Sequence, residues 1–144
     1  MSDTDDIPSG QAQAQVQWLE TDECWRLLQD AAMCRLALVD ADGDPAIYPV
    51  NIRVRNGAVL IRSAEDAKVR SLLERPRVAL ETDGGALRVR WSVIARGTAE
   101  VTGEGDDADG EDDTGSWFPG EKSCLIRITV EAITGKRFLA VAPT

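Results

Sequence analysis

The stretch AIYPVNIRVRNGAVLIR, residues 46–62, carries the clearest structural signal in the sequence. Asn56-Gly57 accepts the positive φ angles that a tight hairpin turn requires, and strand-forming residues flank the turn on both sides. We therefore predict a β-hairpin with strands at 46–54 and 58–62. Pro49 has no N–H for a strand ladder, so the first strand is interrupted there or lies at the edge of a sheet.

Two helices are predicted around this hairpin. Thr21 can cap the first helix, at 22–32, in which apolar residues recur at helical spacing. Ser63 opens the second helix, and Asp66 three residues later completes a capping box. Pro76 ends this second helix because a helix interior does not accommodate proline.

Further apolar runs predict strands at 34–40, 77–82, 86–102, 123–130 and 135–141. We expect turns at Asp83-Gly84-Gly85 and at Thr134-Gly135, and a bulge or a bend at Gly97. The pattern lacks βαβα alternation, so a doubly wound parallel sheet is not expected. The sequence predicts a mainly β (α+β) fold, a small antiparallel barrel of six to seven strands with short covering helices.

Length and composition indicate one folded domain. The chain has 144 residues, of which 43% are hydrophobic and 28% are charged, and its apolar runs are too short to span a membrane. We predict a disordered tail at 1–20, a domain at 21–144 and a mobile acidic loop at 103–115. The acidic, polar N-terminus is unlike a secretory signal, so we expect a cytoplasmic protein.

Several kinds of chemistry are disfavoured by composition. The sequence has no histidine, which removes histidine-ligated metal sites and nucleophiles activated by histidine. Cys24, Cys34 and Cys124 lack CxxC spacing, so we predict no metal site and interpret the cysteines as buried apolar residues. The net charge of −9 disfavours nucleic-acid binding.

The stretch RSAEDAK, residues 62–68, permits two interpretations. Residues 52–77 carry seven basic side chains against three acidic ones, so this region is locally basic within an acidic chain. A capping box at Ser63 explains the stretch as a helix start. A phosphate group could also be held there by the first helical N–H groups with Arg62, Ser63 and Lys68.

Two other motifs are also ambiguous. Pro49 in YPVN, residues 48–51, fits an edge strand, but the backbone amides of Val50 and Asn51 could instead contact a planar polar ligand. Trp91 and Ser92 lie in a long extended segment. Core packing or a subunit interface explains such a tryptophan, and the alternative is a ligand contact across an interface.

Taken in order, these motifs resemble the pyridoxamine 5′-phosphate oxidase-like FMN-binding split-barrel family from about residue 21 to 140. The resemblance rests on WRLL at 25–28, GDP at 43–45, YPVN, the strand ending IRS at 61–63, Lys68, WSV at 91–93 with Gly97, and TGKR at 134–137. It implies a split β-barrel that forms a homodimer and binds one FMN in each of two clefts at the subunit interface.

The resemblance also implies roles for particular residues. Arg62, Ser63 and Lys68 match the phosphate-binding pattern of the family, and Pro49, Val50 and Asn51 match the strand along the isoalloxazine ring. Trp91 and Ser92 resemble the segment that approaches the cofactor from the other subunit. The chain is shorter than the vitamin-metabolising oxidases and lacks their arginine-bearing C-terminal substrate segment, so we do not expect oxidation of the vitamin itself.

The expected function is therefore flavin-mediated hydride or electron transfer to a small molecule. No side chain is predicted to act as a catalytic acid or base. Two alternatives remain open at this point. One is a deazaflavin-dependent reductase of the same fold, and the other is a non-catalytic dimer that binds or senses flavin.

Overall fold

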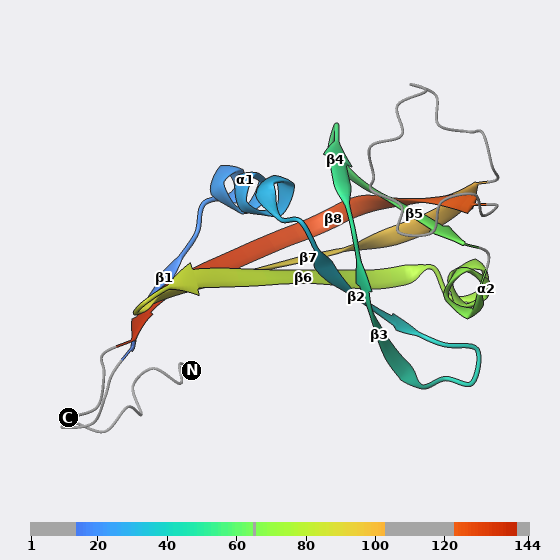
Figure 1. Cartoon of the computed structure of the whole chain (residues 1–144), viewed down its shortest axis with the longest axis horizontal. Coiled ribbons are helices and arrows are strands. Elements are labelled where there is room, and N and C mark those ends of the chain that lie inside the picture. The colour runs from blue at the N-terminus through green and yellow to red at the C-terminus, as the bar shows by residue number, and fades with distance from the viewer. Residues whose placement is uncertain (1–13, 65, 103–122, 141–144) are drawn as a thin grey trace.

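The computed structural model describes residues 14–64, 66–102 and 123–140. These residues form eight strands and two helices (Figure 1). In chain order the elements are β1 (Ala14–Trp18), α1 (Thr21–Asp30), β2 (Cys34–Val39), β3 (Pro45–Val50), β4 (Arg53–Arg55), β5 (Ala58–Ala64), α2 (Ala67–Glu74), β6 (Arg77–Ala86), β7 (Val89–Thr102) and β8 (Ser123–Ala140).

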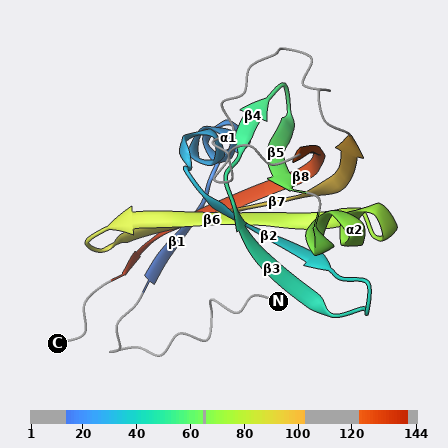
Figure 2. The ribbon, with the colours of Figure 1, turned by 45° about the vertical axis from the view of Figure 1, so that its right-hand side comes forward.

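The strands form one antiparallel sheet in the order β3-β2-β6-β7-β8-β5-β4, and β1 pairs with β8 beside this path. The two end strands, β3 and β4, are joined by residues 51–52 alone, so the chain passes directly from one edge of the sheet to the other. Figure 2 shows this crossing beside the long β6–β7 hairpin. The sheet is open and consistent with the predicted split barrel.

The predicted hairpin at Asn56-Gly57 is confirmed. Asn56 and Gly57 have φ angles of 52° and 77°, and β4 and β5 pair across them. The strand predicted at 46–54 is instead divided into β3 and β4. Pro49 lies in β3, which ends the sheet and, among the described strands, pairs only with β2, as expected for a strand that contains proline.

The predicted start of the second helix is wrong. Strand β5 continues through Ser63 to Ala64 because Ser63 pairs with Cys124 of β8. The helix α2 begins four residues later, and Asp66 is its N-cap residue, with a carboxylate that accepts a hydrogen bond from the Val69 N–H at 3.3 Å. Asp66 therefore caps α2, and Ser63 belongs to the sheet.

The predicted turn at Thr134-Gly135 is also wrong, because β8 is one continuous strand of 18 residues. Gly135 allows α1 to approach the sheet closely. A Cβ atom on Gly135 would lie 2.8 Å from the Cys24 Sγ atom of that helix. The helix itself is shorter than predicted and has Glu20 as its N-cap residue.

The β6–β7 hairpin turns later than predicted. Gly84 and Gly85 belong to β6, and Leu87, with a φ of 56°, lies in the turn. Gly84 makes room for Trp91, because a Cβ atom on Gly84 would lie 2.8 Å from the ring atom Cζ2. The predicted bulge at Gly97 is confirmed by a shift in the β7–β8 register between Arg96 and Gly97.

Strand β1 lies within the predicted tail at 1–20, so that prediction is wrong for residues 14–18. Residues 1–13 and the predicted loop at 103–115 lie outside the described residues. No helix in the described ranges is long and apolar enough to cross a membrane.

The hydrophobic core lies between the sheet and its helices. Buried apolar side chains from β2, β5, β6, β7 and β8 meet residues of both helices. Burial of each such side chain contributes about 1.5–3 kcal/mol. The largest fully buried side chains are Leu28, Leu36, Ile61, Leu72, Leu80, Ile126 and Ile128.

Candidate functional site

A buried lysine forms the centre of the candidate site. Lys68 of α2 is only 7% exposed, and its ammonium group donates a hydrogen bond to the Ser63 hydroxyl. The same ammonium lies 3.4 Å from a carboxylate oxygen of Asp66. A buried charge is tolerated only when it is paired and hydrogen-bonded, and these two partners meet that requirement. The Ser63 hydroxyl donates in turn to the Ala64 carbonyl at 2.9 Å.

The third neighbour of the ammonium is the ring of Tyr48, whose centroid lies 5.5 Å from the Lys68 Nζ atom. This distance permits a cation–π interaction. Tyr48 pairs with Leu36 of β2 and packs against the core. The contact therefore brings together two motifs that are separate in the sequence, YPVN and RSAEDAK.

The other YPVN residues lie around the end of β3. Val50 is buried and pairs with Cys34, whereas Pro49 is exposed and pairs with Arg35. Successive residues of a strand point to opposite faces, so Pro49 and Val50 lie on different faces of the sheet. Asn51 is half-buried in the break between β3 and β4.

Arg62 is half-buried on β5 and pairs with Leu125 of β8. Its side chain leaves the strand on the face opposite to that of Ser63. The Ser63 face continues the core positions Val59 and Ile61, whereas the Arg62 face does not contribute to the core cluster. Arg62 and Ser63 therefore approach the end of β5 from different sides.

Beside Pro49, the outer face of the sheet carries an ionic cluster. The Arg35 guanidinium lies 2.7 Å from Glu81 and 3.2 Å from Asp83. The hydrogen bond to Glu81 and the charge of Asp83 raise the pKa of Arg35. Burial and the neighbouring Asp83 raise the pKa of Glu81, and these effects exceed the opposing effect of Arg35.

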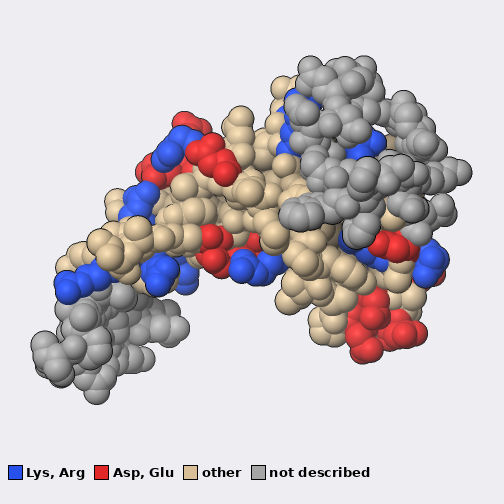
Figure 3. All heavy atoms as spheres, viewed as in Figure 1, with Lys and Arg blue, Asp and Glu red and all other residues tan. Residues whose placement is uncertain are grey.

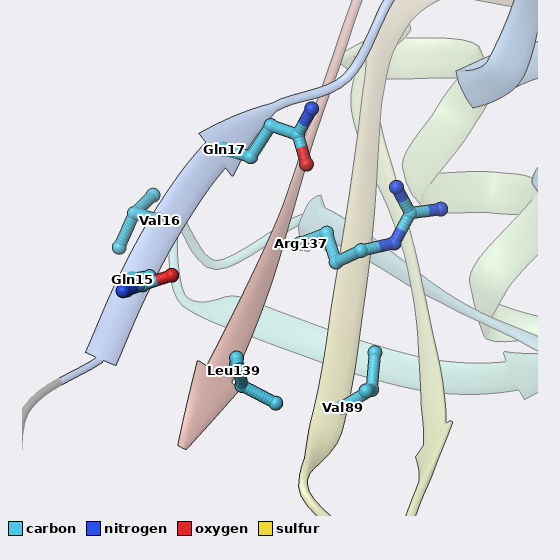
Figure 4. Close-up of a pocket in the computed structure, with 6 residues that line it drawn as sticks. All are labelled: Gln15, Val16, Gln17, Val89, Arg137 and Leu139. Carbon is cyan, nitrogen blue, oxygen red and sulfur yellow. The ribbon is translucent and has the colours of Figure 1, made fainter. Parts of the chain in front are cut away.

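Trp91 and Ser92 lie at the other end of the molecule. Trp91 pairs with Arg137 of β8, which pairs in turn with Gln17 of β1. Side chains of these three neighbouring strands line a hollow of about 450 Å³ (Figure 4). Arg137 also donates a hydrogen bond to Glu23 of α1. The residues lining the hollow are Gln15, Val16, Gln17, Val89, Arg137 and Leu139.

The structure does not bring this end of β7 together with the lysine site. The Ala99 N–H donates to the Pro76 carbonyl just beyond α2, at 2.8 Å. Ser92 lies seven residues before Ala99 on the same strand, which corresponds to about 20 Å. The predicted site residues thus fall into two separate regions in one copy of the chain.

The described residues show neither a continuous basic surface on the face in Figure 3 nor a group of side chains that could hold a metal ion. On the face shown in Figure 3, Lys and Arg side chains are interspersed with Asp and Glu side chains, without a continuous basic area among the described residues. No cluster of three or more histidine, cysteine, aspartate or glutamate side chains in the described ranges could hold a metal ion.

The sequence did not predict that Asp66 and Tyr48 contact Lys68. Asp66 was predicted to be half of a capping box, and Tyr48 was not among the predicted site residues. The spacing of Asp66 and Lys68, two residues apart, was visible but equally compatible with a solvated ion pair. Arg137 was part of the TGKR motif but had no predicted role, because the hollow depends on β1, which the polar sequence at 14–18 did not indicate.

The comparisons with known proteins agree with this architecture. The model of a family described as pyridoxamine 5′-phosphate oxidase matches residues 20–144. None of the curated proteins compared with the chain is significantly similar to it.

The structure of the FAD binding protein from Mycobacterium smegmatis is 31% identical, with a TM-score of 0.71, and the match covers 85% of this chain and 98% of that one. A FAD-binding protein from Mesorhizobium loti is 23% identical, with a TM-score of 0.76. The match covers 88% of this chain and 98% of that one. A structure described as an F420 reductase is 19% identical, with a TM-score of 0.59 and coverages of 75% and 93%. The last two show a shared fold.

Proposed function

The chain belongs to the pyridoxamine 5′-phosphate oxidase family, and from this premise we propose that it is an FMN-binding oxidoreductase. When bound, the flavin supplies hydride or electron transfer, and the substrate is a small molecule other than the vitamin. The observation that carries the proposal is the buried Lys68 ammonium, which lies against Ser63 at the junction of two site motifs.

The groups at this junction fit a phosphate. An ammonium group donates three hydrogen bonds, of which Ser63 and Asp66 account for two among the described residues. A phosphate oxygen would take a third bond or replace the carboxylate. Charge-assisted bonds of this kind are strong, and the low solvent access of Lys68 increases the interaction. Arg62 would add a second cation at the end of β5, from the face of the strand opposite to that of Ser63.

The flavin ring would lie along YPVN. Residues 51–52 interrupt the strand between β3 and β4, so the backbone around Val50 and Asn51 leaves the regular ladder there. In this proposal Pro49, Val50 and Asn51 orient the ring.

We further propose that two copies of the chain complete the site. Trp91 and Ser92 lie far from Lys68 within one copy, so they could meet a cofactor held there only from a second copy. Their end of the sheet exposes large apolar side chains, of which Trp18 is 69% and Leu87 94% exposed. Exposed apolar side chains gathered at one end of a sheet indicate an interface. Among the described residues, Val16 and Trp18 lie on one face of this end, Val89 and Leu139 lie on the other, and Leu87 lies in the β6–β7 turn.

The dimer is tested by the molecular mass in solution. Sedimentation of the native chain should give twice the monomer mass, and Leu139→Asp should give monomers that bind FMN at least tenfold more weakly. Ala41→Asp, at an exposed position in the distant β2–β3 turn, adds the same charge and is the matched control. A native monomer that binds FMN tightly would contradict the composite site.

The cofactor is tested by fluorescence titration with FMN. Lys68→Met keeps the length and apolar stem of the side chain but removes the charge, so FMN affinity should fall at least tenfold while the fold remains stable. Arg70→Met, on the exposed side of the same helix, should leave affinity nearly unchanged. Purified protein that takes up no FMN, or a Lys68→Met variant with native affinity, would contradict the proposal.

FAD and F420 serve as competitors in the same titration. The 31% identical mycobacterial protein is described as FAD-binding, so tighter binding of FAD than FMN would change the assigned cofactor. Preference for F420 would indicate a deazaflavin-dependent reductase. A flavin that binds but is neither reduced nor reoxidised with nicotinamide or quinone partners would indicate a non-catalytic flavin-binding dimer.

The mixed surface charge on the face in Figure 3 and the net charge of −9 support a small-molecule substrate rather than a nucleic-acid partner. We place the proposed enzyme in the cytoplasm, with no membrane partner.

A further inference from the structure

Asp66 and a cofactor phosphate would bind the same ammonium group. We propose that Asp66 is an internal counter-ion of Lys68 that competes with phosphate and weakens the binding of phosphate-bearing ligands. This inference rests on the proposed phosphate site at Lys68. It assigns Asp66 a role in setting affinity in addition to its role as the N-cap residue of α2.

The two oxygens of the Asp66 carboxylate have different partners. Oδ1 accepts the N–H of Val69 at 3.3 Å, which holds the carboxylate at the start of α2. Oδ2 lies 3.4 Å from the Lys68 Nζ atom. The backbone cap therefore fixes the negative charge beside the lysine. The Lys68 side chain is 9% exposed and that of Asp66 is 48% exposed, so the pair joins a buried cation to an anion that solvent reaches.

A phosphate bound to Lys68 would lie close to the Asp66 carboxylate. A phosphate oxygen that accepts a bond from Lys68 lies about 2.8 Å from Nζ. Because Oδ2 is 3.4 Å from the same nitrogen, the two oxygens would be at most about 6 Å apart in the observed arrangement. Two negative groups at that separation repel each other even in water, and a phosphate monoester carries a charge of about −1.5 to −2.

Asparagine separates the two roles of Asp66. It caps helices about as well as aspartate, because its side-chain oxygen accepts the same N–H bond, but it has no charge. In Asp66→Asn the side-chain oxygen should keep the cap of α2, while the amide nitrogen, which cannot accept a hydrogen bond, replaces the oxygen that faces Lys68. Lys68 then keeps Ser63 as its partner and is more available to a phosphate. We expect FMN affinity to rise about five- to tenfold. The substitution removes the repulsion between the solvent-exposed Asp66 carboxylate and a phosphate dianion about 6 Å away.

The experiment compares FMN with riboflavin, which has the same ring but no phosphate. Native protein, Asp66→Asn and Glu74→Gln are titrated with both ligands at fixed ionic strength. Glu74→Gln removes the same charge from the other end of α2, where Glu74 lies 3.5 Å from Arg75. Asp66→Asn should tighten FMN binding and leave riboflavin binding unchanged, whereas Glu74→Gln should change neither by more than about twofold.

Thermal unfolding of each variant checks the fold, and Asp66→Ala, which loses the cap as well, should be less stable than Asp66→Asn. If the native protein binds FMN and Asp66→Asn binds it with the same or lower affinity, the proposed role of Asp66 is wrong and the phosphate site remains. Equal tightening of riboflavin would also overturn it. Failure of the native protein to bind FMN, or native affinity in Lys68→Met, would overturn the proposed function and this inference together.

Discussion

The Lys68 ammonium lies 5.5 Å from the centroid of the Tyr48 ring, in a contact that joins α2 to β3. Tyr48 thus provides a polarisable face to a cation that is almost completely buried. Tyr48→Leu should lower the free energy of unfolding by about 1–2 kcal/mol, since it removes this face and part of the core packing. Urea unfolding measures the loss.

Tyr48→Phe is the matched control, because it keeps the ring and removes only the hydroxyl. It should be close to native in stability. A double-mutant cycle of Tyr48→Leu with Lys68→Met should give a coupling of about 0.5–1 kcal/mol. Additive effects of the two substitutions would mean that the ring and the ammonium do not interact energetically.

Gly97 provides the second prediction. A Cβ atom at this position would lie 2.0 Å from the Thr129 carbonyl oxygen of β8, so Gly97→Ala must displace backbone at the bulge. We expect a loss of at least about 2 kcal/mol in the free energy of unfolding, measured with urea.

Gly43→Ala separates this close contact from backbone strain. Gly43 has a φ of 86°, but a Cβ atom there would meet nothing within 4 Å. Its substitution should lower stability by only about 1 kcal/mol, through the positive φ angle. Equal losses for Gly43→Ala and Gly97→Ala would show that the β8 carbonyl is not what requires glycine at position 97.

The third prediction concerns alkaline pH. Burial raises the pKa of the Cys34 thiol from 9.0 to about 11, although a hydrogen bond with Thr82 opposes this shift. Below pH 9 the thiol is protonated in both the folded and the unfolded chain, so it causes no pH dependence there. As the pH rises from 9 to about 11, only the unfolded chain gains from ionisation, and stability falls by about 2–3 kcal/mol.

Cys34→Ala should remove that part of the loss. The measurement is the difference in unfolding free energy between native protein and Cys34→Ala at pH 8 and at pH 10.5, which cancels the groups that titrate in both proteins. Burial also raises the pKa of Cys24, so Cys34→Ala should retain some dependence on alkaline pH. Parallel pH profiles for the two proteins would contradict a buried, neutral Cys34.

Local signals made part of the fold predictable. The turn at Asn56-Gly57 and the bulge at Gly97 depend on backbone conformations that few other residues adopt, and both are present. The predicted turn at Thr134-Gly135 was wrong because glycine there serves a distant contact. It admits Cys24 of α1, and no local pattern distinguishes this use of glycine from a turn.

Non-local pairing explains the other errors. Strand β1 has a polar sequence and forms by pairing with β8, more than a hundred residues later. Ser63 was predicted as a helix cap because Asp66 follows it at the right spacing, but the pairing of Ser63 with Cys124 extends the strand. Tertiary pairing outweighs a local preference at both positions.

The candidate site could be predicted only in part for the same reason. Ser63 and Lys68 were predicted from the sequence to act together, and the structure brings them into contact. The separation of Trp91 from Lys68 depends on the length and course of β7, which no motif reveals. The position of the Tyr48 ring depends on the pairing of β3 with β2 at the end of the sheet, which brings the ring to Lys68 of α2.

Strand β8 has a consequence for biosynthesis. It follows β1, β5 and β7 in the chain and pairs with all three. A ribosome must therefore make residues 123–140 before β1 has its partner strand or the central β7–β8 ladder can form. Folding of the nascent chain should be late, and until β8 is made the earlier strands have unpaired edges, which favour pairing with other chains.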